Sequence, residues 1–150
     1  LYGKHDYFNL QNGHFIPMLM HRFHKDLLLN RKHIAYGTGT PLRQFLYVDD
    51  FARIILEVLL GDKYNVTTPL ICCNDKEYTI KNIVNLIAYH MDIDIHDICW
   101  DTSKSDGCMK KTVTNAKLKS FYPHFKFTDI DDGIWETFQW FKNNYPNIRK

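Results

Sequence analysis

Residues 37–50 constrain the fold more than any other stretch of the chain. They read Gly-Thr-Gly-Thr-Pro-Leu-Arg-Gln-Phe-Leu-Tyr-Val-Asp-Asp, a cluster of turn residues followed by an apolar stretch and two aspartates. Pro41 fixes φ and the glycines permit a tight backbone, so the cluster predicts a turn. The apolar stretch predicts a strand over 44–48, and the paired aspartates predict the start of a helix.

Arg43 is a candidate phosphate ligand because it stands where the loop becomes the strand. A guanidinium offers a planar fork of donors and keeps its charge at physiological pH. A surface arginine paired with a neighbouring carboxylate explains the same residue equally well from this segment alone. The rest of the chain has to decide between the two interpretations.

Helices and strands alternate along the whole chain, which predicts an α/β fold. Apolar spacing and capping residues predict helices over 15–27, 49–60, 79–91, 115–119 and 128–141. Short apolar runs predict strands over 34–36, 44–48, 69–73, 97–100 and a stretch near 112. In the second helix, one face is expected to be buried: Phe51, Ile54, Ile55, Val58 and Leu59.

The helix starts and the chain ends carry more specific expectations. Thr79 is predicted to cap the third helix, and Thr128 with Asp131 resembles a capping box for the last one. Residues 1–14 read as an irregular loop. The tail over 145–150 is expected to fray.

Composition excludes several classes of protein. The 150 residues fit one domain, covering 1–150, and a net charge of +2 with lysines and arginines scattered among 17 acids predicts no nucleic-acid partner. No apolar run approaches the roughly eighteen residues that span a bilayer, so we expect neither a membrane span nor a signal peptide. The four cysteines lack C-x-x-C spacing, which predicts reduced thiols and a cytoplasmic location. The histidines show no metal-ligand spacing supported by cysteines, so no metal site is predicted.

With these segments placed, the chain resembles the C-terminal half of the GDP-L-fucose synthase family, within the extended short-chain dehydrogenases/reductases. The resemblance covers nearly the whole chain and is carried by four blocks in order: Leu1-Tyr2-Gly3 followed by Asn12-Gly13-His14-Phe15-Ile16-Pro17, then Arg22-Phe23-His24, then residues 37–50, then Asp101-Thr102-Ser103-Lys104-Ser105-Asp106-Gly107. The last block resembles the family's Asp-x-Ser-Lys-Pro-Asp-Gly loop, from which Ser105 departs.

The resemblance implies a substrate-binding unit whose residues 44–73 contribute strands and a helix to a Rossmann sheet. It implies an NADPH-dependent enzyme that epimerises and reduces GDP-4-keto-6-deoxy-mannose to GDP-L-fucose and works as a homodimer. The N-terminal Rossmann half, with most of the NADPH site and the catalytic Tyr-x-x-x-Lys pair, would precede Leu1. We therefore expect the chain to be a fragment that is inactive by itself.

Within this chain, the resemblance assigns His14 as the acid of the epimerisation and places both His14 and Leu1 beside the cofactor. An imidazole suits proton donation and recovery because it titrates near neutral pH. A histidine directly before a helix is otherwise an exposed residue or a substitute cap, and that reading is favoured when the resemblance is set aside.

Arg22, Tyr36, Arg43 and Asp106 match family positions that contact the GDP-sugar. Two arginines from separate elements would neutralise the diphosphate, Tyr36 would pack on sugar or base where the family often has tryptophan, and Asp106 would accept hydrogen bonds from ribose or guanine. Each has a structural alternative. Arg22 can lay its stem over the core, Tyr36 can fill the core, and Asp106 can be the turn residue before Gly107.

Two other functions remain open. A related extended reductase or epimerase acting on a UDP- or dTDP-sugar would share the strand-to-helix block that ends in Val-Asp-Asp. A non-catalytic sugar-nucleotide-binding module would fit a chain in which no Gly-rich dinucleotide fingerprint occurs.

Overall fold

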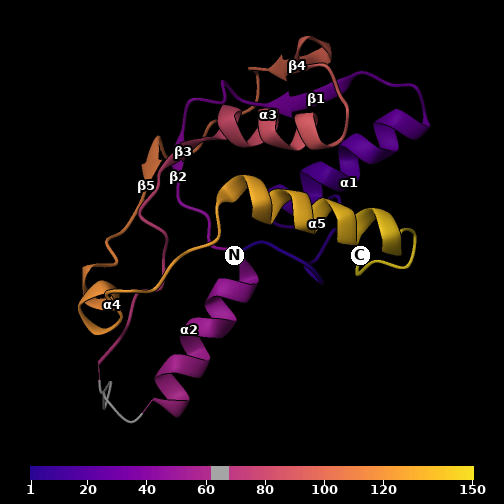
Figure 1. The fold of residues 1–150 in the computed structure, drawn as a ribbon. Coiled ribbons are helices and arrows are strands. Elements are labelled where there is room, and N and C mark those ends of the chain that lie inside the picture. Colours follow the sequence, from indigo (N-terminus) through magenta and orange to yellow (C-terminus); the bar gives the residue numbers. More distant parts are fainter. Residues whose placement is uncertain (62–67) are drawn as a thin grey trace.

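The computed structural model describes residues 1–61 and 68–150 (Figure 1). Helices and strands alternate along it, so the α/β class expected from the sequence is confirmed. The elements are α1 (Phe15–Leu28), β1 (His33–Tyr36), β2 (Leu42–Arg43), α2 (Val48–Leu60), β3 (Tyr78–Thr79), α3 (Ile80–His90), the 3-10 helix Ile95–Asp97, β4 (Ile98–Asp101), β5 (Lys110–Lys111), α4 (Ala116–Phe121) and α5 (Ile130–Asn144).

Helices α1, α3 and α5 enclose the hydrophobic core. Helix α3 packs against both α1 and α5, and α1 also packs against β1 of the β1–β4 pair (Figure 1). Phe23, Ile87 and Phe141 are each 0% exposed. Burial of a side chain of this size contributes about 1.5–3 kcal/mol, so the three apolar stripes predicted from helical spacing hold this part of the molecule together. The α1 stripe ends early, since Leu27 is 46% exposed.

The caps of α3 and α5 explain where these helices begin. Thr79 accepts a hydrogen bond from the Asn82 amide at 3.0 Å, and the Asn82 side chain accepts one from the Thr79 amide at 3.0 Å, a capping box that confirms the predicted cap. For α5 the prediction is wrong. Asp129, not Thr128, is the cap, and its carboxylate accepts the Asp131 amide hydrogen at 3.1 Å.

Two small sheets position the loops that line the candidate site. Strands β1 and β4 pair in parallel from His33 opposite Ile98 to Tyr36 opposite Asp101. Strand β2 lies between β3, which is antiparallel to it, and β5, which is parallel. Because β1 and β4 run in the same direction, the loops after Tyr36 and Asp101 leave from the same edge, the position at which α/β proteins commonly bind ligands.

Helix α2 stands apart from this layer (Figure 1), and of its expected buried face only Ile54 is fully buried. Asp50 and Ile54 are the buried residues of the helix. Ile55 is 40% exposed and Leu59 is 73% exposed, because no described part of the chain covers that face. The predicted end of the helix is confirmed, because α2 ends at Leu60 and Gly61 follows it.

The strands predicted over 44–48 and 69–73 are also absent from the described residues. Strand pairing is limited to Leu42–Arg43, Tyr47 forms a single bridge with Tyr2, and the helix already begins at Val48. Residues 68–73 make no ladder. A strand requires a neighbour along its length to satisfy its backbone groups. Within the described chain and outside α2, residues 46–48 exchange backbone hydrogen bonds with Tyr2 alone, and residues 69–73 have no strand beside them. Residues 62–67 of the 44–73 unit lie outside the described part.

Both ends of the chain are held, contrary to the fraying expected at the C-terminus. The Phe8 amide donates to the Arg149 carbonyl at 2.9 Å, and Ile148 is 7% exposed. The Arg149 guanidinium lies 5.4 Å from the centre of the Tyr7 ring. The irregular N-terminal loop and the tail therefore stabilise each other.

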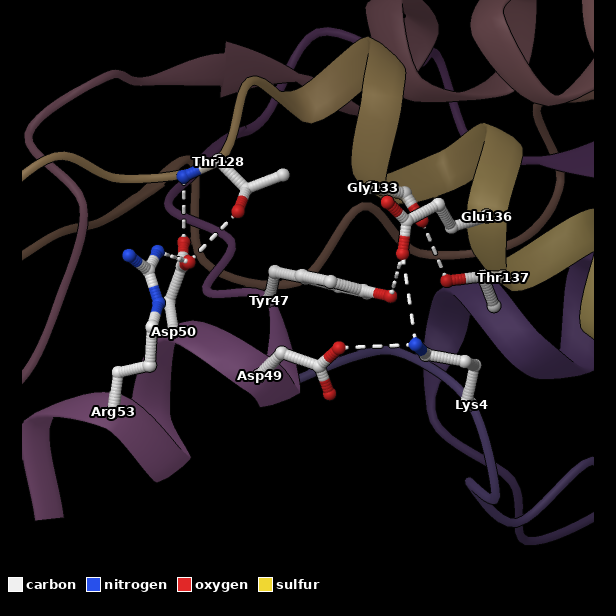
Figure 2. A network of polar contacts seen from close by, with 9 residues as sticks. All are labelled: Lys4, Tyr47, Asp49, Asp50, Arg53, Thr128, Gly133, Glu136 and Thr137. Atoms are coloured by element: carbon white, nitrogen blue, oxygen red, sulfur yellow. Dashed lines mark hydrogen bonds and ion pairs between the residues drawn. The ribbon is translucent and has the colours of Figure 1, made fainter. Parts of the chain in front are cut away.

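A buried carboxylate ties α2 to the start of α5 (Figure 2). Asp50 is 1% exposed and accepts the Thr128 amide hydrogen at 2.8 Å and the Thr128 hydroxyl hydrogen at 2.7 Å. Arg53, one turn later on α2, pairs with the same carboxylate. Thr128 is thus engaged by Asp50, which explains why it does not cap α5.

A second group of polar side chains connects the N-terminal loop with α2 and α5 (Figure 2). The Lys4 ammonium lies 3.0 Å from Asp49 and 3.6 Å from Glu136. Tyr47 donates its phenolic hydrogen to Glu136 at 2.7 Å, and burial raises the pKa of Tyr47 well above its ordinary value. These contacts bring three segments distant in sequence to one point.

Candidate functional site

A cavity of about 160 Å³ opens between α1, β1, β2, α3 and the loop before β5. Apolar side chains from α1 and α3 form its floor: Phe15, Met18, Leu19, Ile80 and Val84. Its polar lining includes Arg22, Tyr36, Arg43, Ser105 and Asp106, so the four residues expected to contact a sugar nucleotide meet at one place.

Arg22 packs against the Tyr36 ring and keeps one donor without a hydrogen-bond partner among the described residues. Its guanidinium carbon lies 4.4 Å from the centre of the Tyr36 ring, and its buried Nε atom has no hydrogen-bond partner among the described residues. Burial is the largest influence on the Arg22 pKa and lowers it from the ordinary value. An unpaired donor at a cavity wall favours an acceptor brought by a ligand.

Tyr36 forms a wall of the cavity and is not a core aromatic. It ends β1, it is 50% exposed, and Arg22 covers one face of its ring. The exposed ring surface can stack on a flat or cyclic ligand group.

Arg43 approaches the cavity from the central strand of the three-stranded sheet. It pairs in register with Tyr78 of β3 on one side and Lys111 of β5 on the other. One guanidinium nitrogen donates to the Leu42 carbonyl at 2.7 Å, which leaves the remaining donors of the fork for a ligand. Two guanidinium groups against one lining carboxylate give the cavity an excess of positive charge.

The Asp106 carboxylate is already engaged, which sequence reasoning did not foresee. One oxygen accepts the Thr38 amide hydrogen at 2.7 Å and the other accepts the Thr38 hydroxyl hydrogen at 2.7 Å. Asp106 therefore holds its loop against Thr38, and a donor on a ligand could use only the remaining lone pairs of the carboxylate. Thr38 is the partner that sequence reasoning missed, because the two residues are 68 positions apart.

His14 lies outside the lining of this cavity. It precedes α1 as its N-cap, its side chain is 73% exposed, and its Nδ1 lies 3.5 Å from Asp6. Its neighbour Phe15 does line the cavity, so the imidazole stands beyond the rim on the side of the N-terminal loop. Leu1 is 58% exposed. Among the described residues, the structure therefore does not bring His14 into the lining of the cavity where Arg22 and Arg43 meet.

Two features are absent from residues 1–61 and 68–150. Within these ranges no group of His, Cys, Asp and Glu side chains is arranged to hold a metal ion. In the same part of the chain, no helix has the length and apolar character needed to cross a membrane. Cys72, Cys73, Cys99 and Cys108 are free thiols.

Comparisons with known proteins show what this chain is similar to. The model of the NAD dependent epimerase/dehydratase family matches residues 1–67. The GDP-L-fucose synthase of Dictyostelium discoideum is 40% identical over 100% of this chain and 47% of its own length. The crystal structure of a GDP-L-fucose synthetase from Naegleria fowleri superposes with a TM-score of 0.93 at 37% identity, over 99% of this chain and 45% of that one. The NADP-bound structure of the same protein gives 0.92 at 36%, over 99% and 46%. The chain spans about half the length of the curated relatives it matches.

Proposed function

Because the chain is homologous over its whole length to the GDP-L-fucose synthases, we propose that it forms the sugar-nucleotide-binding half of such an enzyme. The complete enzyme would epimerise GDP-4-keto-6-deoxy-mannose and reduce it with NADPH to GDP-L-fucose. The observation that carries the proposal is the cavity at which Arg22, Tyr36 and Arg43 meet.

The diphosphate is the part of the ligand that this cavity suits best. Arg22 and Arg43 come from different elements and are both oriented by packing, so they can neutralise two phosphate groups without ordering flexible side chains. Sites for drug-sized ligands occupy roughly 300–1,000 Å³. A cavity of about 160 Å³ therefore takes one portion of a sugar nucleotide, and a second half of the protein would enclose the rest.

His14 would act on the sugar from beyond the rim. In the proposal, a base of the half outside this chain removes a proton from a sugar carbon next to the keto group, and the His14 imidazole donates a proton to the opposite face of that carbon. The exposed position of His14 before α1 leaves room for this. Asp6, 3.5 Å from Nδ1, would orient the ring. Both side chains lie on the N-terminal loop, and Phe15, which directly follows His14, lines the cavity.

The residues of this chain do not by themselves form a dinucleotide site, since the sequence has no Gly-rich fingerprint. In the proposal, NADPH is bound by a Rossmann half outside this chain, with Leu1 and His14 at its edge. The exposed face of α2 and residues 44–73 would pack against that half. We further propose that the complete enzyme is a cytoplasmic homodimer with no membrane or nucleic-acid partner.

Isothermal titration of the chain with GDP-mannose, UDP-glucose and dTDP-glucose tests the proposal. We expect GDP-mannose to bind best, and Arg43→Ala to weaken it by about ten- to a hundredfold, as expected for a charge-assisted hydrogen bond. Arg31→Ala is the matched control, because Arg31 is exposed just after α1 and is not a lining residue. Equal affinity of the wild type and Arg43→Ala would refute the phosphate role. Preference for a pyrimidine nucleotide would favour the alternative reductases.

A further inference from the structure

Thr38 belongs to none of the groups assigned above, yet it fastens a wall of the cavity. We propose that Thr38 is a positioning residue: by holding Asp106, it fixes the loop over 101–107 against the turn over 37–40 and so maintains the ligand cavity. The inference rests on the proposed function, because the position of this wall affects binding only if the sugar nucleotide enters the cavity.

We call the pair of hydrogen bonds from Thr38 to the Asp106 carboxylate the clasp. Thr38 gives its amide hydrogen and its hydroxyl hydrogen to the two oxygens of Asp106, each at 2.7 Å. The Thr38 hydroxyl oxygen lies 2.7 Å from that of Thr40. Since the Thr38 hydrogen is committed to Asp106, the Thr40 hydroxyl must be the donor of this second bond. Bonds to a carboxylate are about twice as strong as neutral ones, so the clasp is a favourable anchor.

The backbone of the turn is shaped around the carboxylate. Gly37 has φ of 79°, and a β-carbon at this position would collide with the Asp106 oxygen that bonds Thr38. The Gly37 amide also donates to the Asp101 carbonyl at 3.0 Å, which extends the β1–β4 pairing up to the clasp. The turn and the loop thus meet at the edge where two parallel strands end.

The clasp is one of two anchors for the segment that carries the wall. At the far end, the Leu42 amide donates to the Met109 carbonyl at 2.8 Å, and β5 continues in parallel with β2. Asp106, which lines the cavity, is itself the first anchor, and Ser105, the other lining residue of this loop, lies between it and the Gly37–Asp101 hydrogen bond. The second anchor is the strand of Arg43, so the clasp sets the distance between the wall and the guanidinium.

The test compares Thr38→Val, Thr38→Ser and a matched control, Thr102→Val, in the 150-residue chain. Thr102 is an exposed threonine of the same loop that takes no part in the clasp. Two quantities are measured: the Kd for GDP-mannose by isothermal titration, and the rate of tryptic cleavage after Lys104, an exposed lysine of the loop. Circular dichroism establishes that each variant is folded.

We expect Thr38→Val to raise the Kd about tenfold and to speed cleavage after Lys104 several-fold, because the loop opens more often. Thr38→Ser keeps the hydroxyl and should restore both values, and Thr102→Val should match the wild type. Cleavage of Thr38→Val at the wild-type rate would overturn the clasp, and faster cleavage with an unchanged Kd would overturn its positioning role. Failure of the wild type itself to bind GDP-mannose would instead reject the proposed function, and the positioning role with it.

Discussion

Helices α2 and α3 have similar apolar patterns and opposite surroundings. Of the 11 residues of α3, Ile83, Val84, Ile87 and Ala88 are buried, whereas the 13 residues of α2 bury only Asp50 and Ile54. Leu59 and Leu60 near the end of α2 are 73% and 76% exposed. An apolar stripe therefore predicts which face of a helix will be buried, but it does not predict which element, in this chain or another, packs against that face. In this chain, the packed layer carries the candidate site, and α2 carries an apolar face that no described residue covers.

Truncating a core side chain should produce the largest difference in unfolding free energy between the packed layer and α2. Phe141→Ala should lower the free energy of unfolding by about 4 kcal/mol, because Phe141 is 0% exposed and its removal leaves a cavity in the layer of α1, α3 and α5. Leu59→Ala should change it by less than about 0.5 kcal/mol. Urea unfolding followed by circular dichroism measures both. Equal losses would mean that the two regions are packed alike.

The tie between the two regions is expected to be the next largest contribution. Asp50→Ala removes the acceptor of both Thr128 bonds and should cost about 3 kcal/mol of unfolding free energy, since a buried donor is left without a partner. Arg53→Ala is the control, because half of the Arg53 side chain is exposed and its loss should cost less than about 1 kcal/mol. The ordering of the two losses in urea unfolding is the result to check.

Acid should weaken the packed layer through His21. Burial lowers the pKa of His21 below its ordinary value, and Lys150 and Lys25 add to this, whereas the hydrogen bond from Nδ1 to the Phe8 carbonyl opposes it. Burial also lowers the pKa of His24, and the charge of His21 adds to this lowering.

The sign follows from this lowered pKa. The unfolded chain binds the proton more readily, so the stabilisation is complete above the unfolded pKa of about 6.5 and is lost as the pH falls through the folded pKa. The urea concentration at the unfolding midpoint should therefore decrease when the pH is lowered from about 7.5 to about 5. In His21→Asn, whose amide can donate to Phe8 without titrating, it should fall less. An equal fall in both proteins would remove His21 as the cause.

The smallest change in stability is expected on the exposed face of α2. A double variant, Leu59→Asp with Leu60→Asp, should unfold within about 0.5 kcal/mol of the wild type, because both side chains already contact water. It should also self-associate less, since exposed apolar patches favour association. Sedimentation velocity measures the association. A marked loss of stability would show that the face is covered in solution.

Local features of the chain could be predicted from the sequence, and features that depend on distant pairing could not. The Thr79 capping box and the stripe of α3 are set by neighbours within one or two turns, and both were predicted correctly. The strands expected over 44–48 and 69–73 fail because a strand exists only beside a partner. The Thr38–Asp106 clasp was missed for the same reason, because it depends on the pairing of β1 with β4.

The candidate site shows the same division. Resemblance to a family selected Arg22, Tyr36, Arg43 and Asp106, and the structure brings all four to one cavity. No sequence pattern revealed that Asp106 is engaged by the protein or that His14 stands outside the cavity. Both facts depend on where a side chain points after the loops have packed.

The most direct test of the central claim is a crystal structure of the 150-residue chain with GDP-mannose. Arg22 and Arg43 should both place guanidinium nitrogens within about 3 Å of diphosphate oxygens, with the Tyr36 ring beside the ligand and the Thr38–Asp106 clasp intact. A diphosphate bound elsewhere, with both arginines unchanged and unoccupied, would contradict the account.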